Sequence, residues 1–286
     1  MRFVHSQPAH AALLVLVALV SGLPAAAQTV TMTTSNPSGS SWETGSGWSD
    51  GQPAGAGKDY VVNGGFLVRS PAATDPVFAG NSLTLNGTGE LRMKHTGTVT
   101  IGTLNLGGVL NNGDNGTKSV AGTVNVLNPA SVTGDAASGA RTTILNSQVT
   151  GAAALNVRQA TAGTNTITLV LANPANTYTG LITVQDRGLL QFDYDAPAGG
   201  PSVDVLTGGK FNLTRDVTFA LGSFRTDGTP LAAGTYDFAA LSDQGLGNYF
   251  NSGPGTLTVV PEPSSAAGIG LLAAGGCALA RRARRR

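Results

Sequence analysis

Short runs in which apolar residues alternate with Thr or Asn recur along the middle of the chain. Clear examples are Leu83–Leu85, Thr123–Leu127 and Ile167–Leu171. A period of two buries one side of each run and leaves the other side in water, which is typical of β-strands. Gly, Asn-Gly, Gly-Gly or Asn-Pro follows the runs, as expected for tight turns. No segment of ten or more residues between 28 and 260 shows good helical periodicity. The pattern therefore predicts an all-β body of many short strands.

Short strands of this kind are compatible with three architectures: a sandwich, a closed barrel and a parallel β-solenoid. The recurring turn chemistry favours the solenoid, in which stacked rungs bury together what no rung can bury alone. Asn recurs within or just after the strands, and in a stacked coil these side chains can form ladders. The positions are Asn86, Asn105, Asn125, Asn156 and Asn212. Few charged residues (12%) and few aromatic residues (6%) also suit a narrow coil packed with Val, Leu and Ile.

One segment carries a recognisable repeat. Asn176-Thr177-Tyr178-Thr179-Gly180-Leu181-Ile182-Thr183-Val184, followed by Gly188-Leu189-Leu190, resembles the autotransporter-associated β-strand repeat, N-x-Y-x-G-x-T-x-V and then G-x-L. The segment departs from that pattern at Ile182-Thr183 and at Leu189. The resemblance implies a right-handed parallel β-helix of the kind found in exported passenger domains. Alternation further predicts that Leu181, Thr183 and Gln185 face away from Ile182 and Val184.

The N-terminal segment has the features of a secretory signal peptide. Arg2 precedes the apolar run Ala11–Val20, which is too short to span about 30 Å of hydrocarbon as a stable helix. Small residues then precede a predicted cut by signal peptidase, at the site formed by Ala25, Ala27 and Gln28. The alternatives are an uncleaved anchor and a buried helix. Export places the body in a compartment that permits disulfides, yet Cys277 is the only cysteine.

The C-terminal segment has three blocks in a fixed order. Pro261, Glu262 and Pro263 form a stiff extended peptide, because proline fixes φ and lacks an amide donor. Residues 264–280 carry no charge and predict a helix at the short end for spanning a membrane. A basic cluster then predicts retention on the cytoplasmic side: Arg281, Arg282, Arg284, Arg285 and Arg286.

These three blocks resemble the PEP-CTERM sorting signal of Gram-negative bacteria. The resemblance implies processing near the P-E-P motif by exosortase, a membrane-embedded cysteine transpeptidase, and delivery of the body to the envelope or matrix. A plain transmembrane anchor with an incidental P-E-P is the alternative. Cys277 is either a lipidation site or a small residue of the helix, and the sequence favours the second.

The chain thus divides into five parts. They are a signal peptide (1–27), an N-terminal cap or linker (28–58), the β-helix body (59–230), C-terminal capping strands (231–260) and the sorting tail (261–286). Trp42 and Trp48 of the cap are candidates for glycan contact through their indoles. Packing of both rings over the first rung is the interpretation that the sequence favours.

Charge and chemistry narrow the function. The net charge is +1, and residues 28–260 hold 11 basic and 15 acidic residues, which excludes a strongly basic nucleic-acid binder. His95 is the only histidine after the signal peptide, and its place at a strand end predicts a surface residue. We expect no catalytic residue, no cofactor and no metal site.

Two acidic segments are the nearest approach to a chemical site. Asp193 and Asp195 share a strand face beside Asp186, and such a patch suits Ca²⁺ or an acid pair. Residues 111–116 (Asn-Asn-Gly-Asp-Asn-Gly) faintly resemble a calcium loop that lacks its bidentate Glu. The sequence favours solvated side chains at a turn before Pro197 for the acidic patch, and a turn for residues 111–116.

Together these features predict an exported, non-enzymatic structural or adhesive protein. It passes through the inner membrane and ends in the cell envelope, at the surface or in the extracellular matrix. Its expected partners are signal peptidase, an exosortase-type transpeptidase, the membrane before processing, and exopolysaccharide. The alternatives are a carbohydrate-binding or polysaccharide-degrading β-helix and a permanently anchored inner-membrane protein. A cleft lined by Asp186, Asp193, Asp195 and either Arg187 or Arg215 would favour the enzyme.

Overall fold

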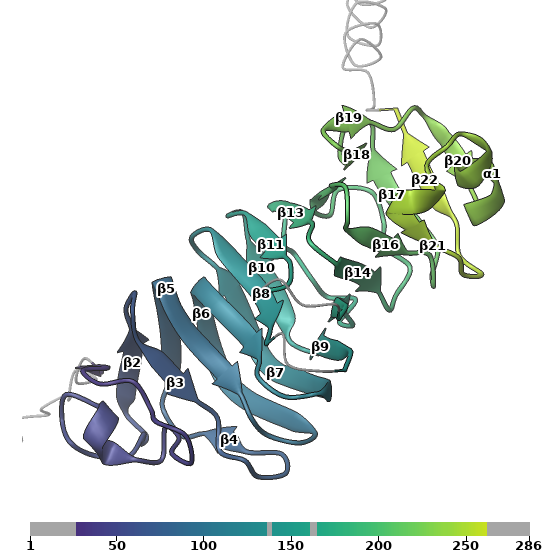
Figure 1. Ribbon diagram of the computed structural model, residues 1–286. Helices are drawn as coiled ribbons and strands as arrows, with labels where there is room; N and C mark the ends of the chain where they lie inside the picture. Colours follow the sequence, from purple (N-terminus) through teal and green to yellow (C-terminus); the bar gives the residue numbers. More distant parts are fainter. Residues whose placement is uncertain (1–26, 136–138, 161–164, 262–286) are drawn as a thin grey trace, which may run out of the picture.

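The computed structural model describes residues 27–135, 139–160 and 165–261. The chain winds into a β-solenoid of about 7 turns, with very little helix. Strands of successive turns pair in parallel, which excludes the sandwich and the closed barrel and confirms the solenoid. Figure 1 shows an elongated stack that runs from the N-terminal end (purple) to the C-terminal end (yellow).

Three parallel sheets form the faces of the coil. The first face contains β1 (Gln28–Thr31), β2 (Lys58–Val62), the first part of β5 (Ser82–Met93), the middle of β6 (Thr98–Asn112), the end of β7 (Gly116–Val126) and β10 (Gln148–Gly151). The second face contains β3 (Leu67–Arg69), the later parts of β5 and β6, β8 (Ala130–Gly134), β11 (Leu155–Val157), β13 (Leu181–Val184), β15 (Ser202–Val205) and β18 (Phe224–Thr226), with β19 (Thr229–Pro230) at its end. The third face contains β4 (Val77–Phe78), the first parts of β6 and β7, β9 (Arg141–Leu145), β12 (Ile167–Leu171), β14 (Gly188–Phe192), β16 (Lys210–Asn212) and β21 (Phe250–Asn251).

Strands β5, β6 and β7 continue around the corners of the coil, so the faces join into one 19-stranded sheet. Beyond β10 the first face has no regular strand in the next turn. The backbone still pairs there, since the amide groups of Thr177 and Thr179 donate to the carbonyl oxygens of Val149 and Gly151. Further on, Ala196 forms an isolated parallel bridge with Val217 of β17 (Val217–Ala220), which pairs with β22 (Leu257–Val260) in a separate three-stranded sheet.

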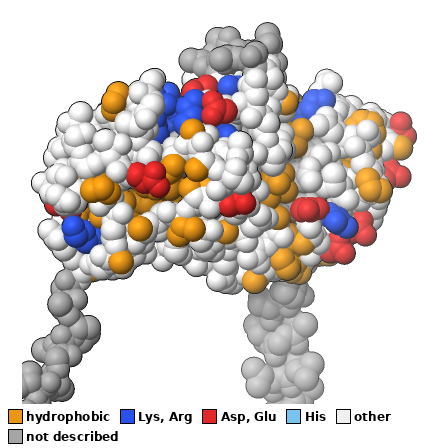
Figure 2. Space-filling model, turned by 90° about the horizontal axis from the view of Figure 1, so that it is seen from below, with side chains coloured by type: hydrophobic (Ala, Val, Ile, Leu, Met, Phe, Trp, Pro, Cys, Tyr) orange, Lys and Arg blue, Asp and Glu red, His pale blue; other side chains and the backbone are white. Residues whose placement is uncertain are grey.

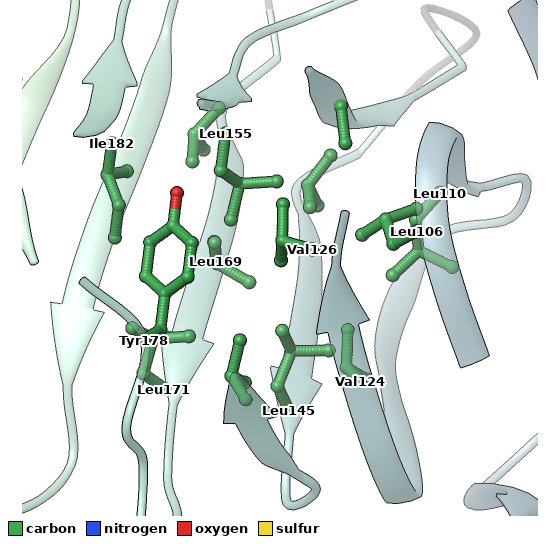
Figure 3. Close-up of a cluster of buried hydrophobic side chains, with 14 of the residues drawn as sticks. Leu106, Leu110, Val124, Val126, Leu145, Leu155, Leu169, Leu171, Tyr178 and Ile182 are labelled. Carbon is green, nitrogen blue, oxygen red and sulfur yellow. The ribbon is translucent and has the colours of Figure 1, made fainter. Parts of the chain in front are cut away.

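The core is a set of apolar columns inside the coil. On the second face the column passes through Leu91, Leu110, Val132, Val157 and Val184, which pair in register and are fully buried. Figure 3 shows side chains from several turns meeting in the middle of the coil. Burial of these aliphatic side chains, at about 25 cal/mol per Å² of apolar surface, is the main stabilising term.

Asparagine ladders run along the outside of the coil, as the sequence predicted. The Nδ2 group of Asn125 donates to Oδ1 of Asn105 (3.1 Å), and Nδ2 of Asn105 donates to Oγ1 of Thr84 (3.1 Å). The hydroxyl of Thr150 donates to Oδ1 of Asn125 (2.6 Å). The ladder therefore crosses four successive turns on the first face.

The repeat-like segment has a close-packed geometry. Ile182 and Val184 are buried, whereas Leu181 is exposed and Thr183 half-buried, which confirms the predicted alternation. The buried hydroxyl of Tyr178 lies 2.6 Å from the carbonyl oxygen of Ala153. A Cβ atom at Gly180 would lie 2.4 Å from that hydroxyl, so the glycine is needed for close approach.

Aromatic clusters close both ends of the coil. At the N-terminal end the rings of Trp42, Trp48, Tyr60 and Phe78 pack edge to face at 4.8–5.4 Å, beside the 3-10 turn η1 (Gly45–Gly47). At the other end the rings of Phe192, Phe211, Phe219, Phe224 and Phe250 pack together. That end is covered by β17, β22 and β20 (Gly234–Tyr236), by α1 (Phe238–Asp243) and by η2 (Gly247–Tyr249).

Candidate functional site

The predicted processing sites flank the coil. Ala27 and Gln28 are exposed where β1 begins, and Pro261 is exposed directly after β22. Ala25, Glu262, Pro263, the helix over 264–280, Cys277 and the terminal arginines lie outside the described residues. Both predicted cuts therefore border a folded unit that spans 28–260.

Trp42 and Trp48 are not available to a sugar. Their exposed fractions are 1% and 2%, and the indole Nε1 of Trp48 donates to the carbonyl oxygen of Trp42 (3.1 Å). Stacking on a glycan requires an open ring face, so the glycan-contact prediction is wrong. Both rings pack over the first rung.

The acidic patch does not form a cleft. Asp186, Asp193 and Asp195 are exposed, and Asp193 forms a solvated ion pair with Arg215 (3.3 Å). Arg187 instead lines a pocket of about 350 Å³ whose lining contains no Asp or Glu. Among the residues that the structure describes, no three Asp, Glu, His or Cys side chains group to hold a metal ion.

Asp114 is bound to lysines. Its carboxylate lies 2.7 Å from Nζ of Lys94 and 3.9 Å from Nζ of Lys118. Asn111 and Asn112, at the end of β6, are buried, and their side-chain amides donate to protein oxygens. The one carboxylate of residues 111–116 is therefore paired with lysines, whereas Oδ1 of Asn111 and Oδ1 of Asn112 are buried without a hydrogen-bond partner.

His95 is fully buried, so its prediction as a surface residue is wrong. The chain turns inward after β5 because the hydroxyl oxygen of Ser70 accepts the amide groups of Lys94 (2.7 Å) and His95 (3.1 Å). Ser70 Oγ also lies 3.2 Å from His95 Nδ1. With both amides donating to this oxygen, the hydroxyl donates to Nδ1, which places the histidine's proton on Nε2.

Burial and the charge of Lys118 lower the pKa of His95 to about 4, so the ring is neutral at pH 7. A base of such low pKa activates a serine weakly, and in this structure Nε2 has no hydrogen-bond partner. The pair of Ser70 and His95 therefore has the geometry of a turn cap.

Behind His95 the coil contains a polar layer, which we define as His95, Asn112, Lys118, Arg141 and Thr143. These side chains are 0–3% exposed. Lys118 is the register partner of Thr143, and Arg141 lies two residues before Thr143 on the same face of β9. Lys118 donates to the carbonyl oxygen of His95. Two cationic side chains thus enter the apolar core of the coil.

The electrostatics of the layer are unfavourable for its cations. Burial lowers the pKa of Lys118, and the nearby charges of Lys94 and Arg141 lower it further, whereas Asp114 raises it. Arg141 is 2% exposed, and its Nε and Nη1 atoms have no hydrogen-bond partner. Buried polar groups are normally paired, so each exception requires an explanation.

A surface pocket of about 430 Å³ lies next to the layer. It is lined by the loop 38–43 together with Arg69, Ser70, Lys94 and Asp114. Ser70 separates this pocket from His95. In the space-filling view of Figure 2, most of the visible Lys and Arg side chains lie in one patch, next to Asp and Glu side chains.

Sequence reasoning missed Lys118 and Arg141, although a signal was present. Lys118 is in phase with Val120, and Arg141 and Thr143 are in phase with Leu145, so alternation places all of them on the inward side.

No protein-family model, no curated protein and no solved structure matches this chain. Within the described ranges, the structure contains no apolar helix of the length required to cross a bilayer.

Proposed function

We propose that the protein is an exported, non-enzymatic structural or adhesive component of the cell surface or extracellular matrix, sorted through its C-terminal tail. The observation that carries the proposal is the agreement between the folded unit and the predicted processing sites. β1 begins at Gln28 and β22 ends at Val260, so cuts at the two sites release the coil whole. The resemblance to the autotransporter-associated β-strand repeat also supports export, because such repeats belong to right-handed β-helices of exported passenger domains.

The outer surface supports an adhesive role. The ladder of Thr84, Asn105, Asn125 and Thr150 presents amide and hydroxyl groups at the spacing of adjacent strands, about 4.8 Å. A regular row of weak polar contacts suits polyvalent binding to a polysaccharide. We therefore take an exopolysaccharide as the partner.

Intact-mass analysis of the protein from its host tests the sorting. The wild type is expected to lose both ends and to leave the membrane fraction. Changing Pro261, Glu262 and Pro263 to Ala should keep the last residues attached and hold the protein in the membrane. Pro129→Ala, at an exposed proline of the body, is the control and should be processed normally. A wild type that keeps its last 20 or so residues identifies a permanently anchored protein instead.

Polysaccharide binding needs a separate assay. Sedimentation with the host's exopolysaccharide should carry the wild type down, and changing Asn105 and Asn125 to Ala should weaken binding by removing half of the ladder. Binding that equals that of an unrelated β-protein contradicts adhesion. Release of new reducing ends contradicts a non-enzymatic role and favours the polysaccharide-degrading alternative.

A further inference from the structure

Arg141 carries a charge that the described structure leaves without a counter-ion. An arginine side chain carries its positive charge on a planar guanidinium with five N–H donors. It is 2% exposed, and both Nε and Nη1 are buried without a hydrogen-bond partner. A buried ion without compensation costs several kcal/mol. A fold that retains this arginine therefore needs a negative group beside it.

The chain itself does not supply that group. Every Asp and Glu except Glu262 lies in the described residues, and none of them is within ion-pair distance of Arg141. Residues 136–138 (Ala-Ala-Ser) and 161–164 (Thr-Ala-Gly-Thr) contain no acidic residue in the sequence. Asp114 is the nearest carboxylate to the layer, and it lies 2.7 Å from Lys94 and 3.9 Å from Lys118.

The surrounding atoms offer further donors. His95 Nε2 and the hydroxyl of Thr143 are buried with no partner that meets hydrogen-bond geometry, although the backbone of Ser119 is close enough to His95 to raise its pKa. The layer also contains one buried acceptor without a partner, Oδ1 of Asn112. Gly134 gives Arg141 its room, because a Cβ there would lie 2.6 Å from Cδ of the arginine. The layer therefore combines two cations with unpaired polar groups inside the coil.

We propose that Arg141 and Lys118 bind a small monovalent inorganic anion of the chloride class inside the coil. The size follows from burial, because side chains that are 0–3% exposed leave no opening for a sugar or a peptide. We infer an anion of charge −1 from the net charge of the layer. Asp114 offsets part of the charge of Lys118, and no described carboxylate pairs with Arg141. The anion stabilises the middle turns of the coil.

Thermal unfolding of the full-length protein tests the site. Chloride is exchanged for gluconate at constant ionic strength, so general screening does not change. Above its Kd, each tenfold rise in chloride should raise the Tm by about 3–5 °C. Arg141→Met should abolish this response. Arg158→Met, at an exposed arginine, should respond like the wild type.

Two results decide against the anion. One is a wild-type Tm that is equal in chloride and gluconate, and this measurement does not depend on whether any variant folds. The other is an equal chloride response in the wild type and in folded Arg141→Met, which assigns the effect to the surface. Broadening of the chloride NMR resonance provides an independent check, since the wild type should broaden it more than Arg141→Met or Arg141→Lys.

Discussion

Gly180 shows how closely single residues are packed in this coil. Its φ is not positive, so the backbone there does not require glycine. A Cβ would instead lie 2.4 Å from both the hydroxyl of Tyr178 and the carbonyl oxygen of Ala153. The glycine and the tyrosine of the repeat-like segment are thus one packing unit.

Gly180→Ala should therefore lower the free energy of unfolding by about 1–3 kcal/mol, the usual cost of overpacking a core. Gly55→Ala is the matched control, because its nearest atom would lie at 3.8 Å and its φ is not positive. Urea unfolding measures both variants. Equal stability of the two variants would contradict the packing argument.

The burial of His95 predicts that the protein loses stability in acid. Its pKa in the folded state is about 4, below the ordinary 6.5, mainly because of burial. Between pH 6.5 and pH 4, His95 is protonated in the unfolded chain but not in the folded chain. The free energy of unfolding therefore decreases as the pH falls through this range. At pH 4.5 the loss from this residue is about 2.5 kcal/mol.

Urea unfolding at pH 7.5 and pH 4.5 checks this loss in the wild type and in His95→Asn. The difference in stability between the two pH values should be smaller by about 2.5 kcal/mol in the variant. Other acid-sensitive groups, including Asp50, are common to both proteins and cancel. An identical pH dependence would show that His95 titrates normally in the folded state.

At the scale of elements, stability comes from columns of strands that no strand forms alone. Leu110 of β6 pairs in register with Leu91 of β5 and with Val132 of β8, and all three are fully buried. Removing one side chain leaves a cavity between three turns. By contrast, Leu127 points outward and is 58% exposed.

Leu110→Ala should cost about 2–5 kcal/mol, whereas Leu127→Ala should change stability by less than about 0.5 kcal/mol. Both variants remove the same atoms, so the comparison isolates burial. Differential scanning calorimetry measures the pair. A similar small loss in both would mean that the coil is loosely packed at this turn.

At the scale of the whole molecule, the ends decide whether the coil stays single. An open end of a β-solenoid exposes unpaired strand edges, which invite pairing with another chain. The C-terminal end is covered by α1, whose Leu241 is fully buried, and Asp237 caps this helix by accepting the amide of Ala240 (2.8 Å).

Leu241→Ala should loosen this cover and cause concentration-dependent association. Size-exclusion chromatography with light scattering measures the mass. Leu221→Ala, at a leucine that is 44% exposed near the same end, is the control and should leave the mass unchanged. A Leu241→Ala protein that keeps the mass of the wild type at all concentrations would contradict the capping role.

The local pattern was sufficient for the strands, for the inward positions of Ile182 and Val184, and for the ladder of Asn105 and Asn125. Alternation and turn chemistry are properties of neighbouring residues, and a stacked coil repeats them from turn to turn. The motifs that predict export and sorting come from the sequence, because almost all of both end segments lies outside the described structure.

Only the tertiary structure decided the lengths of the turns and the contents of the core. Register partners are 20 residues apart at Leu104 and Val124 but 27 apart at Val157 and Val184, since each corner takes up a different length of chain. Ser70 holds His95 inward at one such corner, and the register of β7 and β9 places Arg141 two residues from the partner of Lys118. These contacts join residues on different turns, and the energy of a buried charge depends on neighbours that no local pattern identifies.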